Sequence, residues 1–227
     1  MSTKSSKNKP EIIKRRSTSA VAIFVDGVGL DRACRRIRRR VDWKKLLQSL
    51  SGGKRLIEAR YYNLLPHSDD NRQSAFLDNL ALAGFTCIIK RLPPKTVDKQ
   101  VSITVEMASD LMAFALGQTE YPDLNYTNFR SSTQNKDLDD EDFARSIVTP
   151  LSPEEAKQLT KREVILVCPS KEMDYPVSFL NRIGISTITA DFGTFTTNKI
   201  VTASSDWIDL SLAENIWHGA ENSRLST

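Results

Sequence analysis

Carboxylates that follow predicted strands are the residues of this sequence best suited to chemistry. Asp26 closes the apolar run 20–26, and Glu172 and Asp174 follow the apolar run 164–168. Because the carboxyl ends of parallel strands lie at one edge of a sheet, these side chains are expected to converge there. Carboxylates that meet without a matching Lys or Arg repel one another unless a hard cation lies among them. The pattern therefore predicts Mg²⁺ or Mn²⁺, and attack of a metal-activated water on a phosphodiester.

Other acidic residues near the starts of elements could join this group: Asp98, Glu106, Asp110 and Asp191. A purely structural interpretation stays open beside the catalytic one. Asp26 could serve only as the N-cap of the helix that follows it. An acid at a helix start also interacts favourably with the helix dipole, and any one of these residues could do only that.

Basic residues are concentrated in the first part of the chain. Residues 1–60 hold 17 Lys and Arg against 5 Asp and Glu, which leaves 15 against 23 for the rest. Six arginines fall within 32–40, on a predicted helix whose apolar face carries Leu30, Cys34, Ile37 and Val41. This distribution favours contact with a polyanion. The alternative is a solvated helix face next to a disordered basic tail.

Apolar runs alternate with helical patterns along most of the chain, which predicts an α/β fold with a central, mainly parallel sheet of about five strands. Residues 1–18 are expected to be a disordered basic tail, 117–163 a flexible acidic insertion with one short helix after Ser152, and 213–227 a C-terminal tail. The predicted strands are 20–26, 56–65, 85–92, 164–168 and 186–190. The predicted helices are 30–41, 43–50, 71–83, 97–116, 176–183 and a terminal helix over 206–217, with a loop over 191–198.

Several classes of protein find no support in the sequence. No apolar run reaches the roughly 18 residues of a membrane span, and the N-terminus lacks the apolar segment of a secretory signal. The three cysteines, Cys34, Cys87 and Cys168, are far apart and are expected to be reduced thiols of a cytoplasmic protein. With two histidines, His67 and His218, no His-based triad or zinc site can be assembled, and neither a P-loop nor a dinucleotide-binding glycine motif is present.

Six segments, in their order along the chain, resemble the NYN-domain proteins, in the LabA-like branch of the PIN-like nucleases. The first is Ala22-Ile-Phe-Val-Asp-Gly-Val-Gly-Leu30, and the signature Ser170-Lys-Glu-Met-Asp-Tyr175 resembles the family's Ser-Gly-Asp-Ser-Asp-Phe. The resemblance covers about 20–116 and 163–212, and it implies a three-layer PIN-like (Rossmann-like) domain over 19–212, interrupted by the acidic insertion. The remaining similar segments are 41–43 with 59–62, 71–85, 97–115 and 203–210.

The resemblance implies catalytic and metal-binding roles for four acids: Asp26, Asp110, Glu172 and Asp174. The chain departs from the family pattern at three positions. Gly29 stands where the family usually has Asn, Ser102 stands where it has Asp, and Glu172 replaces an Asp. Asp98 and Glu106 are candidates to substitute for the missing acid. Because Mg²⁺ requires near-octahedral geometry, these departures bear directly on activity.

The hypothesis is a metal-dependent ribonuclease-like protein that acts on or binds RNA through these carboxylates. Basic residues would hold the RNA backbone: Arg35, Arg36, Arg39, Lys99 and Lys171. Lys171 could equally neutralise a carboxylate of an inactive site or simply face solvent. The alternative is a catalytically degenerate NYN-fold regulatory or scaffold protein that binds RNA, a protein partner or a second copy of itself.

Overall fold

A single parallel sheet organises the structure, a computed structural model that describes residues 19–66, 71–94, 96, 101–118, 147–159, 161–194 and 198–219. The sheet has six strands in the order β3-β2-β1-β4-β5-β6, and every neighbouring pair is parallel. Their bounds are β1 Ser19–Asp26, β2 Arg55–Leu65, β3 Thr86–Arg91, β4 Lys161–Val167, β5 Ser186–Asp191 and β6 Asp206–Asp209.

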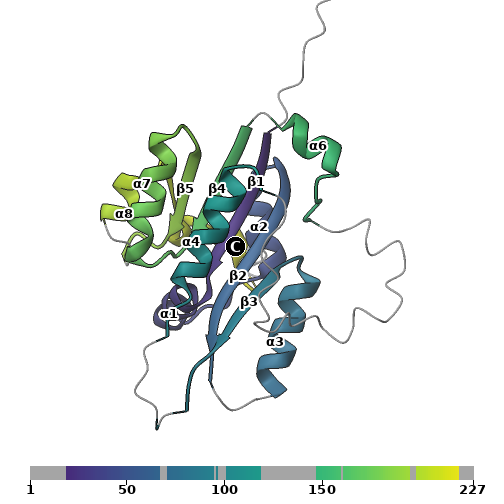
Figure 1. Cartoon of the computed structure of the whole chain (residues 1–227). Coiled ribbons are helices and arrows are strands. Elements are labelled where there is room, and N and C mark those ends of the chain that lie inside the picture. Colours follow the sequence, from purple (N-terminus) through teal and green to yellow (C-terminus); the bar gives the residue numbers. More distant parts are fainter. Residues whose placement is uncertain are drawn as a thin grey trace, which may run out of the picture.

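Helices cover both faces of this sheet, so the domain has three layers (Figure 1). One face packs against α1 Gly27–Ile37, α2 Trp43–Ser51 and α3 Asn71–Leu82. The other face packs against α4 Thr104–Ala115, α7 Asp174–Arg182 and α8 Asn198–Ala203. The remaining described helices are α6 Pro153–Gln158 and the short 3₁₀ segments η2 Lys171–Met173, η3 Leu210–Leu212 and η4 Glu214–Ile216.

The central strand β1 is buried on both sides, as its continuous apolar run predicts. Val21, Ile23 and Val25 belong to the core under α1–α3, while Phe24 points into the core under α4 and α7. Asp26 comes two residues after Phe24 and ends the strand. Because side chains of a strand alternate between the two faces of the sheet, Asp26 lies on the same face as Phe24, at the carboxyl end of β1.

The strand order reverses between β1 and β4. The chain first adds β2 and β3 on one side of β1, and then β4, β5 and β6 on the other. In open α/β sheets ligands bind beside the carboxyl ends of the strands at such a switch point. Asp26 and the residues after Val167 border it.

The predicted α/β fold is confirmed, and the sheet has one strand more than expected. The prediction of a terminal helix from Asp206 to Trp217 is wrong, because β6 occupies Asp206–Asp209 and two 3₁₀ segments follow. This short strand pairs with β5 at the sheet edge. Residues 191–198 were predicted to be a loop. In the structure β5 ends at Asp191 and α8 begins at Asn198.

Helix α1 ends before Val41, which was predicted to lie on its apolar face. Arg38 takes the left-handed conformation, with φ of 55°, and closes the helix after Ile37. Val41 instead forms an antiparallel bridge with Trp217. Trp217 is 2% exposed, so the packed domain extends past residue 212 into the segment assigned to a C-terminal tail.

The ends of several other elements also differ from the prediction. Helix α4 begins at Thr104 rather than Val97, and α7 begins at Asp174. The short helix after Ser152 is present as α6, with a complete capping box between Ser152 and Glu155. Residues 1–18 and most of the acidic insertion, 119–146, lie outside the described residues.

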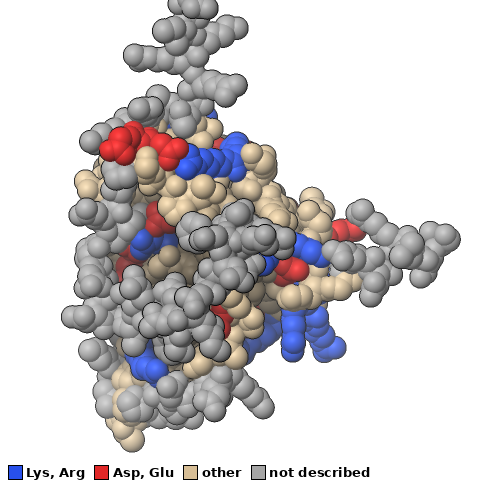
Figure 2. Space-filling view, turned by 90° about the vertical axis from the view of Figure 1, so that its right-hand side faces the viewer, with Lys and Arg blue, Asp and Glu red and all other residues tan. Residues whose placement is uncertain are grey.

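The described chain provides no membrane crossing, since none of its helices combines the necessary length and apolar character. Cys34, Cys87 and Cys168 are free thiols. Burial raises the pKa of Cys34 to about 11 and that of Cys87 to about 12. Figure 2 shows that Lys and Arg side chains lie in several small groups on one face of the molecule, beside scattered Asp and Glu.

Candidate functional site

Asp26 ends β1 and turns the chain into α1. Its Oδ1 accepts a hydrogen bond from the N–H of Gly29 at 3.0 Å, and only 7% of the residue is exposed. Burial raises the pKa of Asp26 above its ordinary value, against the opposing effect of nearby backbone N–H groups and the charge of Arg32. Asp26 is therefore both the N-cap of α1 and a perturbed acid at a strand end, a combination common at functional sites.

Ser170, in the connection after β4, interacts with three other residues at this edge of the sheet. Its backbone N–H interacts with Asp26. Its hydroxyl lies 3.3 Å from the hydroxyl of Thr104, at the start of α4. The pKa of Glu172 is lowered, first by its own backbone N–H and then by the Ser170 hydroxyl. Two of the predicted site acids thus share one neighbour at the carboxyl ends of the strands.

The departure at Gly29 has a steric cause in this fold. A Cβ built on Gly29 would lie 2.2 Å from the backbone oxygen of Cys168. Cys168 is itself in the left-handed conformation, with φ of 49°, which is uncommon for a residue other than glycine. The start of α1 therefore packs directly on the backbone at the exit of β4, and a side chain at position 29 would require this backbone to move.

Asp110 lies on the inner face of α4, where two side chains of β2 hold it. Its Oδ2 accepts hydrogen bonds from Nη1 of Arg60 at 2.8 Å and from the hydroxyl of Tyr62 at 2.9 Å. Burial acts to lower the pKa of Arg60, but the negative charges of Glu58 and Asp110 leave it raised. Burial raises the pKa of Tyr62, and Asp110 raises it further, so Tyr62 is a neutral donor.

Each of the remaining acids of interest has its own contacts, and Asp191 shares Cys168 as a neighbour with Asp26. Glu106 forms an ion pair with Lys90 of β3. Asp174 lies in the first turn of α7, where a negative charge favours the helix dipole. Asp191, at the end of β5, is buried, and its Oδ1 accepts the N–H of Phe192 at 2.7 Å. Asp98 lies outside the described residues.

The predicted metal centre requires several carboxylates to lie close together at this edge of the sheet. Within the residues that the structure describes, no three His, Cys, Asp or Glu side chains gather closely enough to hold an ion. Asp110 already has a cation beside it, since Arg60 pairs with both Asp110 and Glu58, and this reduces the repulsion that a metal would relieve. The assignment of Asp26, Asp110, Glu172 and Asp174 as joint metal ligands therefore stays a prediction.

Sequence reasoning missed Arg60, Tyr62 and Ser170. Arg60 is 9% exposed in the middle of a strand that runs between two other strands. A charged residue inside an otherwise buried strand requires a partner of opposite charge. That signal was present in the sequence, although it could not identify Asp110, which is 50 residues away along the chain.

The predicted RNA-binding arginines in α1 and in the connection after it are exposed. Arg35 pairs with Asp31 at 2.7 Å, one helical turn earlier. The guanidinium carbon of Arg39 lies 5.0 Å from the ring centre of Trp217, a cation–π distance. Arg36 and Lys171 are also exposed, and Lys99 lies outside the described residues.

Fold and site together define a three-layer α/β domain of the PIN-like kind, with acids at the switch point of a parallel sheet. The NYN domain family model matches residues 20–122 of this chain. A crystal structure of a protein of unknown function from Vibrio parahaemolyticus is similar in fold, with a TM-score of 0.59 at 16% identity over 88% of this chain and 97% of that one. The comparison with curated proteins gave no match.

Proposed function

We propose that this protein binds single-stranded RNA, and that its acidic edge is a degenerate form of a PIN-like nuclease site. The observation that carries the proposal is the contact of Asp110 with Arg60 and Tyr62. An acid held by a guanidinium and a phenol hydroxyl is satisfied without a metal ion. Loss of cleavage would leave the binding of RNA as the retained activity. On the order of its motifs, we assign the chain to the LabA-like branch.

The basic surface that would contact RNA comprises α1 and the connection that follows it. Six arginines lie between residues 32 and 40, and all six are exposed. Arginine binds phosphate oxygens with two parallel hydrogen bonds, and this attraction is independent of sequence and sensitive to salt. The acidic remainder of the chain would repel the same strand and so orient it toward α1.

Binding of a labelled single-stranded RNA at several salt concentrations tests this proposal. The double variant Arg35→Ala, Arg39→Ala should weaken binding and reduce the salt slope by about 1.4, since each phosphate contact on a single strand contributes about 0.7. Arg182→Ala is the matched control, because this exposed arginine lies on α7, across the sheet. Absence of RNA binding by the wild-type protein at low salt would refute the proposal.

Metal-dependent cleavage of RNA is the second candidate, which the burial and raised pKa of Asp26 favour. Incubation of the same RNA with Mn²⁺ separates the two candidates when the wild type is compared with Asp26→Asn. Cleavage that disappears in the variant would establish the enzyme. Intact RNA retained by both proteins supports binding alone, and equal cleavage by both would reveal a contaminating nuclease.

A further inference from the structure

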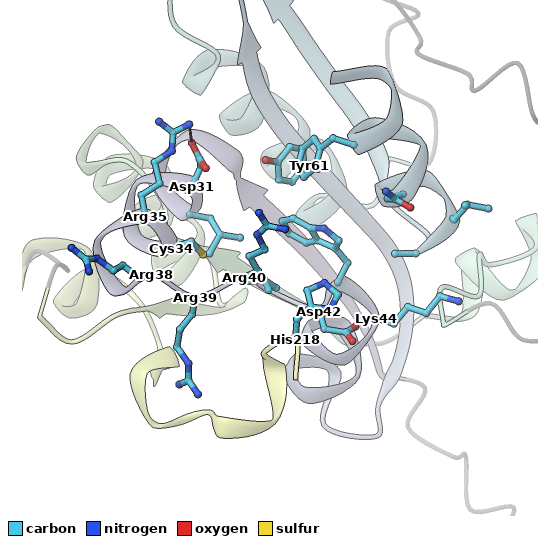
Figure 3. A pocket seen from close by; sticks show the side chains of 17 residues that line it. Asp31, Cys34, Arg35, Arg38, Arg39, Arg40, Asp42, Lys44, Tyr61 and His218 are labelled. Carbon is cyan, nitrogen blue, oxygen red and sulfur yellow. Dashed lines mark ion pairs between the residues drawn. The ribbon is translucent and has the colours of Figure 1, made fainter. Parts of the chain in front are cut away.

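A cavity of about 900 Å³ opens beside α1 (Figure 3). It lies between the end of α1, the connection 38–42, the start of α2 and one side of α3. Its size falls in the range of small-ligand sites, which hold about 300–1,000 Å³. Its lining includes none of Asp26, Asp110, Glu172 and Asp174.

The rim of this cavity carries an excess of positive charge. Its acids are Asp31, which pairs with Arg35 at 2.7 Å, and Asp42, which accepts the N–H of Lys45 at 3.1 Å. In Figure 3 Arg40 turns toward the middle of the cavity, whereas Arg38 turns away from it. The basic side chains of the lining are Arg35, Arg38, Arg39, Arg40 and Lys44.

The backbone places these arginines at the cavity mouth. Arg38 occupies the left-handed position that closes α1, where its N–H donates to the carbonyl of Arg35 at 3.3 Å. Glycine is the common residue at such a helix end, and a side chain there carries a conformational cost. The helix therefore ends within the run of arginines, and the arginines that follow it line the rim of the cavity.

Aromatic side chains form the wall of the cavity below this rim. Trp43 meets Tyr61, Phe76 and Phe85 edge to face, with ring centres 5.5, 5.9 and 5.8 Å apart. Trp43 and Phe76 line the cavity and are only half-buried, so part of each ring is accessible from it. The exposed side-chain amide of Asn79 adds a hydrogen-bonding group to the same wall.

We propose that this cavity binds one unpaired nucleotide of the RNA strand. The base would lie against the rings of Trp43 and Phe76, while the flanking phosphates would contact Arg39 and Arg40. An apolar aromatic wall below a cationic rim matches a nucleotide, which joins a flat apolar ring system to an anion. This inference rests on the proposed RNA binding and adds a contact with the base, which the arginines alone do not provide.

The test compares a short fluorescein-labelled oligouridylate with an abasic strand of the same length, whose phosphates are identical. The wild-type protein should bind the intact strand about tenfold more tightly, because stacking on an aromatic side chain contributes an effect of this order per base. Asn79→Trp, which places a bulky ring beside the wall formed by Trp43 and Phe76, should abolish the preference and leave the affinity for the abasic strand unchanged. Ser49→Trp, at an exposed position of α2 outside the cavity, is the control and should behave as the wild type.

The outcomes separate this inference from the proposal on which it rests. Equal affinity of the wild type for both strands would overturn the nucleotide site and leave RNA binding by α1 intact. A preference that survives in Asn79→Trp would place the base elsewhere and overturn it too. If the wild type bound neither strand, the proposed function itself would fail. Unchanged thermal unfolding of both variants would show that they are folded.

Discussion

At the scale of single residues, the close packing of Cys168 on position 29 favours glycine there. Gly29→Ala forces a methyl group against the carbonyl of Cys168, which neither strand nor helix can easily move aside. Overpacking of this kind costs about 1–3 kcal/mol. We therefore expect a fall of that size in the free energy of unfolding, measured by urea denaturation. Arg32→Ala, an exposed position of the same helix, is the control, and an equal loss there would remove the steric explanation.

Asp26 gives a prediction about pH, because burial raises the pKa of this carboxyl in the folded state. The folded protein then holds the proton more tightly than the unfolded chain, so the group favours folding below the unfolded pKa and costs stability as the pH rises through the folded pKa. Asn at this position keeps an acceptor for the N–H of Gly29 without a charge. The stability of Asp26→Asn relative to the wild type should therefore rise with pH above about 4 and then level off.

Thermal unfolding of the two proteins between about pH 3 and pH 8 measures this difference. A difference that falls with pH, or that does not change, would show that Asp26 is not a destabilised acid. The same variant is the one used in the cleavage assay. Its unfolding curve therefore also shows whether loss of cleavage reflects chemistry rather than loss of structure.

At the scale of the elements, α2 depends on its N-cap. The carboxylate of Asp42 accepts the N–H of Lys45 at 3.1 Å, and loss of such a cap costs about 1 kcal/mol. Asp42→Ala should lower the unfolding free energy by this amount in urea denaturation. Asp31→Ala is the matched control, because its exposed pair with Arg35 is worth only about 0.3–0.5 kcal/mol. Equal losses in the two variants would argue against the cap.

At the scale of the whole molecule, the distribution of charge gives a prediction about metal ions. Asp110 and Glu106 each pair with a basic residue from a neighbouring strand. We therefore expect Mn²⁺ to raise the melting temperature by less than about 1 °C, whereas an ion bound at a hundred times its dissociation constant would add about 2.7 kcal/mol and several degrees. EDTA should leave the affinity for RNA unchanged. A large increase in the melting temperature with Mn²⁺ would instead support the nuclease hypothesis.

Much of the fold follows from local pattern. The apolar runs determined β1, β2, β3, β4 and β5 to within a few residues, because a strand buried on both faces requires such a run. The capping box at Ser152 likewise determined the start of α6. The short edge strand β6 was missed, because it pairs along β5 alone and carries no run of its own.

The sequence by itself determined that Asp26 lies at a strand end and that an arginine-rich helix follows it, since both depend on neighbouring residues. Only the tertiary structure decided what each acid contacts. Arg60 and Asp110 meet because β2 and α4 pack together, and Trp43 and Phe76 border one cavity because α2 and α3 cover the same face of the sheet. Such contacts join distant segments, and the periodicity of neither segment specifies its partner.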